Sequence, residues 1–82
     1  MRARRCKIEI VKEVLELLSR KHMSKTEIIK RSNLNFNTGI EILEQLEARG
    51  LIEKRGNKYT ITKKGIELQE VLISVEDYLI YY

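Results

Sequence analysis

The spacing of apolar residues changes abruptly at Gly50, and this change restricts what the chain can fold into. Before Gly50, apolar residues recur every three or four positions, as they do on amphipathic helices. Directly after it, residues 51–54 and 58–61 form two short runs typical of strands, and the Arg-Gly-Asn at 55–57 supplies the positive-φ residues of a tight turn. Helical spacing returns after Thr62. The sequence therefore predicts a mainly α-helical fold with one small β-hairpin.

Two helices are predicted in the first third of the chain. The first, from about Arg5 to Arg20, carries apolar residues over half of its circumference, a face wide enough to contact more than one neighbour. Ser24 and Glu27 have the spacing of a capping box, in which each side chain bonds the other residue's amide. A second, short helix should therefore run from Lys25 to about Arg31.

A third helix is predicted between Asn35 and Gly50. Asn35 is a good N-cap, and Gly50 has the position of the glycine that follows a helix end. Gly39 lacks a side chain and would let a neighbouring helix approach closely. The inner face of this helix is expected to consist of apolar residues at spacings of four, three and three: Phe36, Ile40, Leu43 and Leu46.

The composition excludes several classes of function. The 82 residues include a single Cys and a single His, so neither an internal disulfide nor a Cys-only metal site can form. The chain has no phosphate-binding glycine loop, catalytic triad or acid–base carboxylate pair. We therefore expect no enzymatic activity, no cofactor, no metal and no small-molecule ligand. No apolar run is long enough to span a membrane. The length is that of one domain and the single Cys fits a reducing compartment, so a single cytoplasmic domain is expected.

The charges are divided into blocks along the chain. Residues 1–31 hold ten basic and four acidic residues, and residues 51–65 hold five basic and one acidic. Residues 32–50 have an acidic excess, and residues 66–82 hold four acidic residues and no basic one. Such separated blocks indicate a surface that meets an anionic polymer, with the acidic end turned elsewhere. A solvated surface without a partner is the alternative.

The last predicted helix, residues 63–82, has apolar residues on two sides. Ile66, Ile73 and Ile80 form the narrower stripe. One small domain can cover only one side of such a helix, and large exposed apolar patches are uncommon on soluble monomers. We therefore expect a homodimer, whereas packing of both stripes within one monomer is the alternative. The expected dimer interface is the broader stripe, formed by Leu68, Val71, Leu72, Val75, Tyr78, Leu79 and Tyr82.

The segments on either side of the hairpin carry a family resemblance. Residues 46–54, Leu-Glu-Ala-Arg-Gly-Leu-Ile-Glu-Lys, resemble the junction between the third helix and the wing of winged helix-turn-helix proteins. Residues 59–65, Tyr-Thr-Ile-Thr-Lys-Lys-Gly, resemble the junction between the second strand and the last helix in archaeal members. Within that superfamily the chain is most similar to the small archaeal chromatin-type (10a-type) winged-helix dimers, which share the Asn-Leu-Asn turn at 33–35.

This resemblance implies the element order α-α-α-β-β-α and a division of the chain into two parts. Residues 1–62 would be a winged helix-turn-helix DNA-binding domain with a basic N-terminal arm, and residues 63–82 a C-terminal dimerisation helix. Because that helix has only about 20 residues, a short helical pairing is expected rather than a long coiled coil.

The resemblance also implies binding of double-stranded DNA, with the helix after Asn35 entering the major groove by its N-terminal end. The outward face of that helix carries Glu41 and Glu44 but no Lys or Arg. We therefore expect contacts near its N-terminus, and cations elsewhere that bind phosphates largely independently of sequence. The residues expected to contact DNA are Arg2, Arg4, Arg5, Lys25, Lys30, Arg31, Asn35, Asn37, Thr38, Lys54, Arg55, Asn57 and Lys58.

The expected function is that of a homodimeric transcription regulator or a chromatin-type architectural protein associated with the nucleoid. Two other functions are open at this stage. The chain could be a winged-helix protein–protein interaction module that does not bind DNA, or it could bind structured RNA through the same cations. Each basic segment could also serve only to keep the protein in solution.

Overall fold

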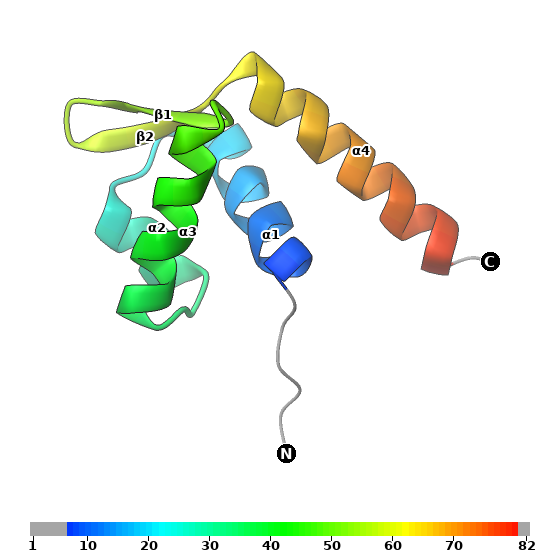
Figure 1. Ribbon diagram of the computed structural model, residues 1–82, viewed down its shortest axis with the longest axis horizontal. Coiled ribbons are helices and arrows are strands. Elements are labelled where there is room, and N and C mark those ends of the chain that lie inside the picture. Colours follow the sequence, from blue (N-terminus) through cyan, green and yellow to red (C-terminus); the bar gives the residue numbers. More distant parts are fainter. Residues whose placement is uncertain (1–6, 81–82) are drawn as a thin grey trace.

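Four helices and one hairpin build the described part of the chain, in the order predicted from the sequence. The computed structural model describes the backbone of residues 7–80 and the side chains of residues 7–75. The order is α1 (Lys7–Arg20), α2 (Lys25–Arg31), α3 (Phe36–Ala48), β1 (Ile52–Arg55), β2 (Lys58–Ile61) and α4 (Lys63–Ile80) (Figure 1). The predicted fold class, mainly helical with a small hairpin, is confirmed.

The N-terminal cap of α3 forms as the sequence predicts, and α2 forms the Ser24 half of its predicted capping box. The Oγ of Ser24 accepts a hydrogen bond from the Glu27 amide at 3.3 Å. The Oδ1 of Asn35 accepts from the amides of Asn37 at 2.9 Å and Thr38 at 3.4 Å. These side-chain oxygens satisfy amides that have no partner within the first turn of a helix, and they set where each helix begins.

The base of the hairpin is tied to both α3 and α4. Gly50 ends α3 with a φ of 75°, as predicted, and the Leu51 amide bonds back to the carbonyl of Leu46 at 3.0 Å. The Thr62 hydroxyl donates to the Gly50 carbonyl at 2.7 Å and accepts from the Gly65 amide at 3.1 Å, which caps α4. Gly65 lies so close to the Leu51 carbonyl oxygen that a Cβ there would collide with it.

The turn of the hairpin contains two residues, because Arg55 pairs with Lys58 in an antiparallel register. Gly56 provides a φ of 64° at the first central position, the arrangement of a type II′ turn. The prediction that Asn57 shares the left-handed conformation is wrong, because Asn33 is the one non-glycine residue of positive φ within residues 7–80. Asn33 occupies the tight turn between α2 and α3.

A third extended segment joins the hairpin at Met23, and no local pattern in the sequence predicts it. Met23 forms an isolated antiparallel bridge with Tyr59 of β2. The Met23 amide donates to the Tyr59 carbonyl at 3.2 Å, and the Tyr59 amide donates to the Met23 carbonyl at 2.7 Å. This bridge fixes the start of α2 beside the hairpin.

The hydrophobic core lies between α1, α2, α3 and the hairpin, and α3 contributes Ile42, Leu43 and Leu46 to it. Gly39 allows the predicted close approach: a Cβ there would lie 2.5 Å from Cγ1 of Ile29 in α2. The residues of the core cluster are Val14, Leu15, Leu18, Met23, Ile28, Ile42, Leu43, Leu46, Leu51, Ile52 and Tyr59.

The predicted inner face of α3 is wrong at its N-terminal end. Phe36 is 57% exposed, and Ile40 is only half-buried. Phe36 is the first residue of α3, one turn before the crossing with α2 at Gly39. Helical spacing alone would place it inward, but the core does not extend that far along the helix.

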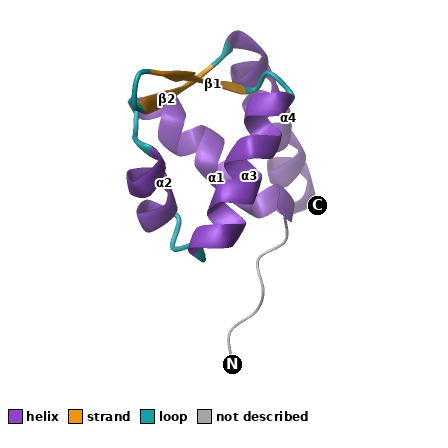
Figure 2. Cartoon of the chain, turned by 60° about the vertical axis from the view of Figure 1, so that its left-hand side comes forward, coloured by secondary structure: helices purple, strands orange, loops and turns teal. Residues whose placement is uncertain are grey.

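The elements are arranged so that the molecule has two different sides. The hairpin, α2 and α3 lie on the side that Figure 2 turns forward, and α4 lies beyond α1 on the other side. The C-terminal half of α4 projects from the rest of the molecule in Figure 1. No helix within residues 7–80 is both long enough and apolar enough to cross a lipid bilayer.

Candidate nucleic-acid interface

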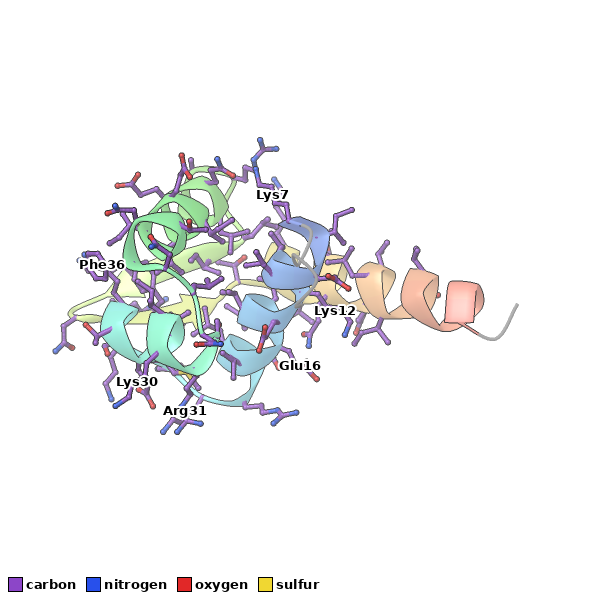
Figure 3. All side chains as sticks on the ribbon, turned by 90° about the horizontal axis from the view of Figure 1, so that it is seen from below. Lys7, Lys12, Glu16, Lys30, Arg31 and Phe36 are labelled. Carbon is purple, nitrogen blue, oxygen red and sulfur yellow. The ribbon has the colours of Figure 1, made fainter. Side chains whose placement is uncertain are left out.

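The elements that carry the described residues predicted to contact DNA are α2, α3 and the hairpin, which share one side of the molecule, here named the α2–α3–hairpin face (Figure 2). Lys25 and Lys30 come from α2, and Lys54 and Lys58 come from the two strands. Lys30, Lys54 and Lys58 are exposed, whereas Lys25 is half-buried. Figure 3 shows Phe36 pointing outward on the side where the hairpin tip lies, and Lys30 pointing outward from α2 beside Arg31.

Two of the predicted arginines are already paired with carboxylates. Arg55 contacts Oε1 of Glu53 through both Nη2, at 3.0 Å, and Nε, at 3.1 Å. The Nε of Arg31 lies 3.4 Å from Oε2 of Glu27. Both pairs are solvent-exposed, so each contributes little to stability. They nevertheless lower the positive charge that these arginines present to an anionic partner.

Glu27 therefore has a different role from the one predicted for it. In a capping box its carboxylate would bond back to the Ser24 amide. Instead the same oxygen that meets Arg31 also lies 3.5 Å from Nζ of Lys21, so Glu27 bridges the end of α1 to α2. The spacing of four residues between Glu27 and Arg31 is a signal that could have indicated this pair.

The Asn35 side chain was predicted to contact DNA, but its oxygen caps the N-terminus of α3. The amides of Asn37 and Thr38 already have that oxygen as acceptor, so a phosphate at this end would have to displace it. Asn37 is exposed and Thr38 is half-buried. The first turn of α3 therefore offers mainly the side chains of Phe36 and Asn37 to a partner.

The hairpin is also held next to the acidic side of α3. Burial raises the pKa of the Tyr59 hydroxyl above its usual value of 10.0, and the carboxylates of Glu47 and Glu44 raise it further. The Nζ of Lys54 lies over this ring, 6.0 Å from the centroid, at the outer limit of a cation–π contact. Tyr59 thus anchors the hairpin in the core while Lys54 stays exposed.

The α2–α3–hairpin face is consequently close to electrically neutral. Its cations are Lys25, Lys30, Arg31, Lys54, Arg55 and Lys58, and its carboxylates are Glu27, Glu41, Glu44, Glu47 and Glu53. The charge blocks of the sequence overstate the positive charge here, because folding brings the carboxylates of α3 close to the basic hairpin. Arg2, Arg4 and Arg5 of the predicted arm lie outside the described residues.

The predicted dimer stripe on α4 is partly used within the subunit. Leu68 and Leu72 are half-buried, whereas Val71 and Val75 are 56% and 49% exposed. Ile8, at the start of α1, is also exposed. The side chains of Tyr78 and Leu79, and Tyr82 as a whole, lie outside the described part of the chain.

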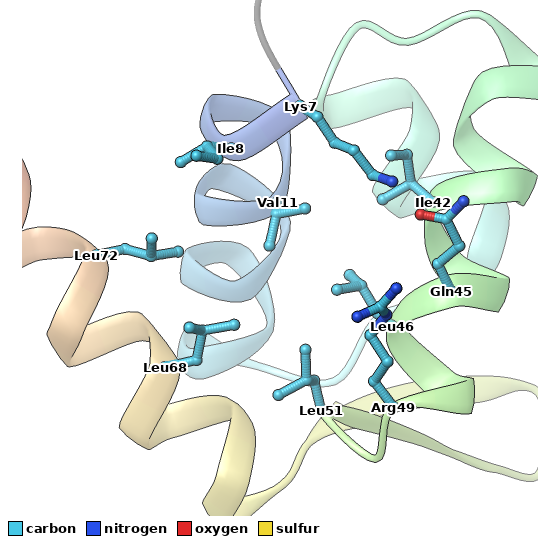
Figure 4. A pocket seen from close by; sticks show the side chains of 10 residues that line it. All are labelled: Lys7, Ile8, Val11, Ile42, Gln45, Leu46, Arg49, Leu51, Leu68 and Leu72. Atoms are coloured by element: carbon cyan, nitrogen blue, oxygen red, sulfur yellow. The ribbon is translucent and has the colours of Figure 1, made fainter.

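An open groove of about 350 Å³ lies between α1, α3 and α4, next to these residues. Apolar side chains of all three helices face it, and Lys7 extends across it from α1 toward Gln45 of α3 (Figure 4). Arg49 borders the groove at the end of α3. Across the side chains that the structure describes, no group of three or more His, Cys, Asp or Glu residues is placed to hold a metal ion.

The profile of a family described as winged helix-turn-helix matches residues 4–79 of the chain. A MarR family transcriptional regulator from Silicibacter pomeroyi DSS-3 is similar in structure, with 21% identity, a TM-score of 0.70, and coverage of 88% of this chain and 55% of that one. Lactococcus lactis ZitR, wild type, is also similar, with 13% identity, a TM-score of 0.73, and coverage of 99% and 58%.

A structure described as PigF with SAH shares 14% identity at a TM-score of 0.58, over 71% of this chain and 19% of that one. The chain thus spans little more than half the length of the two regulators. At these identities the likeness establishes a shared fold. No curated protein matches the chain significantly.

Proposed function

We propose, because the chain belongs to the winged helix-turn-helix family, that it is a DNA-binding transcription regulator. The observation that carries this proposal is that the first turn of α3 and the hairpin tip are exposed on the same side of the molecule. In a helix-turn-helix, the second helix of the motif enters the major groove by its N-terminal end. Here that helix is α3, and the hairpin would contact the backbone beside it.

The phosphate contacts of the proposed complex would come mainly from lysines. Lys25, Lys30, Lys54 and Lys58 are the cations of the α2–α3–hairpin face for which the described side chains include no ion-pair partner. If each neutralised one phosphate, the slope of log affinity against log salt would be about −3.6 per protomer. Arg31 and Arg55 would add to this slope only after leaving Glu27 and Glu53.

The acidic residues of α3 restrict how this helix can enter the groove. Glu41, Glu44 and Glu47 are exposed along it, and carboxylates are repelled by the phosphates that line a groove. We therefore propose a shallow approach in which only the first turn of α3 reaches base edges. Asn37 would bond an adenine edge there.

The proposed active form is a homodimer that pairs through α4, so that residues 1–62 bind DNA and residues 63–82 join the subunits. Val71 and Val75 on α4 are exposed apolar side chains, and burying a valine contributes roughly 1.5–3 kcal/mol. Because closed two-fold pairs are the commonest homo-oligomers, a symmetric dimer is favoured. Two copies of the α2–α3–hairpin face would then contact one duplex.

A chromatin-type architectural role is the finer form of this proposal, in which the protein binds along nucleoid DNA in the cytoplasm with little sequence preference. The exposed lysines Lys30, Lys54 and Lys58 support it, because contacts of such cations with phosphates would carry no sequence information. A regulator of one operator would instead bind one sequence far more tightly than random DNA, by a factor of roughly 10³ or more.

The experiment that tests the proposed function is a gel shift of the purified protein with random-sequence duplex DNA at low salt, competed with duplex RNA. We expect a shift that duplex DNA competes away more effectively than RNA. The absence of any shift at low salt would contradict DNA binding, and stronger competition by RNA would assign the same cations to an RNA ligand.

A second candidate is a protein–protein interaction module, and two observations favour it. The α2–α3–hairpin face is nearly neutral, and α4 exposes Val71, Val75, Ile66 and Ile73. In that case α4 would bind a different protein, and the purified chain would be a monomer that does not shift DNA. Light scattering together with the gel shift separates the two functions.

A further inference from the structure

Phe36 is the one phenylalanine of the chain, and its side chain is 57% exposed. It is the first residue of α3, directly after the Asn35 cap. The two cap bonds from the Asn37 and Thr38 amides to Asn35 fix the backbone of this first turn. A large aromatic side chain is thus held outward on a rigid support.

The crossing of α3 and α2 that follows Phe36 is tight. One turn further along α3, Gly39 lies against Ile29 of α2, with only 2.5 Å between the position of a Cβ and Cγ1 of Ile29. At Gly39 the two helices therefore leave no room for a side chain between them. Phe36, at the start of α3, points outward on the side where the hairpin tip lies (Figure 3).

On the proposed function, the first turn of α3 is the part of the chain that reaches the base edges of the major groove. There a thymine differs from every other base by its exposed C5-methyl group, and an aromatic or aliphatic side chain makes apolar contact with that methyl. The carboxylates of Glu41 and Glu44 keep the later turns of α3 away from the phosphates. An exposed aromatic side chain at the leading end is therefore the apolar group best placed to meet a methyl.

We propose that Phe36 is a specificity-determining residue that contacts thymine methyl groups in the major groove. This inference rests on the proposed function and deepens it. The affinity for DNA, which phosphate contacts would largely provide, would rise with the number of thymine methyl groups that face the first turn of α3. The chain would then prefer thymine-bearing sites although most of its contacts are independent of sequence.

The test compares two short duplexes that differ only in the methyl group: an alternating A·T duplex, and the same duplex with every thymidine replaced by deoxyuridine. Affinities are measured by fluorescence anisotropy at low salt. Burying one methyl group corresponds to an affinity change of about fourfold. We expect the wild-type chain to bind the thymidine duplex about fourfold more tightly for each methyl contacted.

Phe36→Ala should bind both duplexes equally, with little change in affinity for the deoxyuridine duplex, and Phe36→Leu should keep part of the preference. Lys58→Ala is the matched control, because it should weaken both duplexes by the same factor. Ile73→Ala, which removes an exposed apolar side chain from α4, should leave the preference unchanged. Far-UV circular dichroism checks that each variant is folded.

Equal binding of the two duplexes by the wild-type chain would overturn the inference while leaving the proposed function intact. A preference that persists in Phe36→Ala would also overturn it, because the methyl would then be sensed by another residue or through DNA shape. Failure of the wild-type chain to bind either duplex at low salt would remove the proposed function itself.

Discussion

The two exposed surfaces of this chain differ in how far their side chains are satisfied within one subunit. On the α2–α3–hairpin face, Arg31 and Arg55 are paired with carboxylates, and cations and carboxylates nearly balance. On α4, Val71 and Val75 remain largely exposed beside the half-buried Leu68 and Leu72. The apolar surface therefore has the stronger requirement for a partner. The charged surface is nearly balanced within the subunit, so it needs only weak contacts.

The largest effect is expected from placing a charge on the apolar surface. Val75→Asp would bury an unpaired carboxylate in the proposed α4 interface, at a cost of several kcal/mol. Its dimer dissociation constant should rise by at least roughly 100-fold, so light scattering at micromolar concentration should give the mass of a monomer.

Ser74→Asp is the matched control for this change. Ser74 is the neighbouring exposed residue and lies on the acidic side of α4, so its substitution should leave the dimer intact. A Val75→Asp protein with the mass of the wild-type chain would place the interface elsewhere.

The contact between the base of the hairpin and the start of α4, at Gly65, joins the two surfaces. Adding a single methyl group there should lower the stability of the fold. In Gly65→Ala the new Cβ would meet the backbone carbonyl of Leu51, which cannot move without shifting the hairpin relative to α4. We expect a loss of about 3 kcal/mol in the free energy of unfolding, near the upper end of ordinary point mutations. Urea denaturation measures it.

Gly50→Ala provides the comparison within the same junction. Gly50 has a φ of 75° but no atom within 4 Å of its Cβ position, so only backbone strain of about 1–2 kcal/mol is expected. Equal losses for the two variants would mean that the hairpin and α4 are not packed as described.

The charged surface should respond more moderately. Lys54→Ala combined with Lys58→Ala should weaken binding to random duplex DNA roughly tenfold at low salt and flatten the salt slope by about 1.8. Lys63→Ala combined with Lys64→Ala removes the same charge from the exposed start of α4. That control should change affinity by less than about twofold, and anisotropy titrations that gave equal losses would show binding through net charge alone.

The smallest effect concerns the pH dependence of stability. The raised pKa of Tyr59 means that the folded chain holds this proton more tightly than the unfolded chain does. The resulting stabilisation is complete below pH 10.0, which is the usual pKa of a tyrosine hydroxyl, and it is lost as the pH rises through the raised pKa of Tyr59. Tyr59→Phe should therefore lose less unfolding free energy above pH 10.0 than the wild-type chain, as measured by urea denaturation. An identical decline in both proteins would contradict this assignment.

Much of the fold could be predicted because its signals are local. Ser24, Asn35 and Thr62 cap the helices that follow them, and Gly50 and Gly56 take the positive φ values expected of them. Each signal depends on a few neighbouring residues, so it can be recognised without knowing the tertiary structure.

The parts that could not be predicted depend on tertiary contacts. The exposure of Phe36 depends on where α2 crosses α3, and the bridge between Met23 and Tyr59 joins segments far apart in the sequence. The near-neutral charge of the candidate site arises because folding brings Glu44 and Glu47 next to the basic hairpin. The candidate residues and the outward-facing Glu41 and Glu44 were thus recognisable from the sequence, but not the closeness of Glu44 and Glu47 to the hairpin.

The central claim is that the two surfaces have separate partners, DNA for the α2–α3–hairpin face and a second copy for α4. Titration of the ¹⁵N-labelled protein with a short duplex, followed through its backbone amide resonances, tests this most directly. We expect chemical-shift changes confined to α2, the first turn of α3 and residues 54–58, with the amide resonances of residues 68–75 unchanged. Shifts concentrated on α4, or no shifts at low salt, would contradict it.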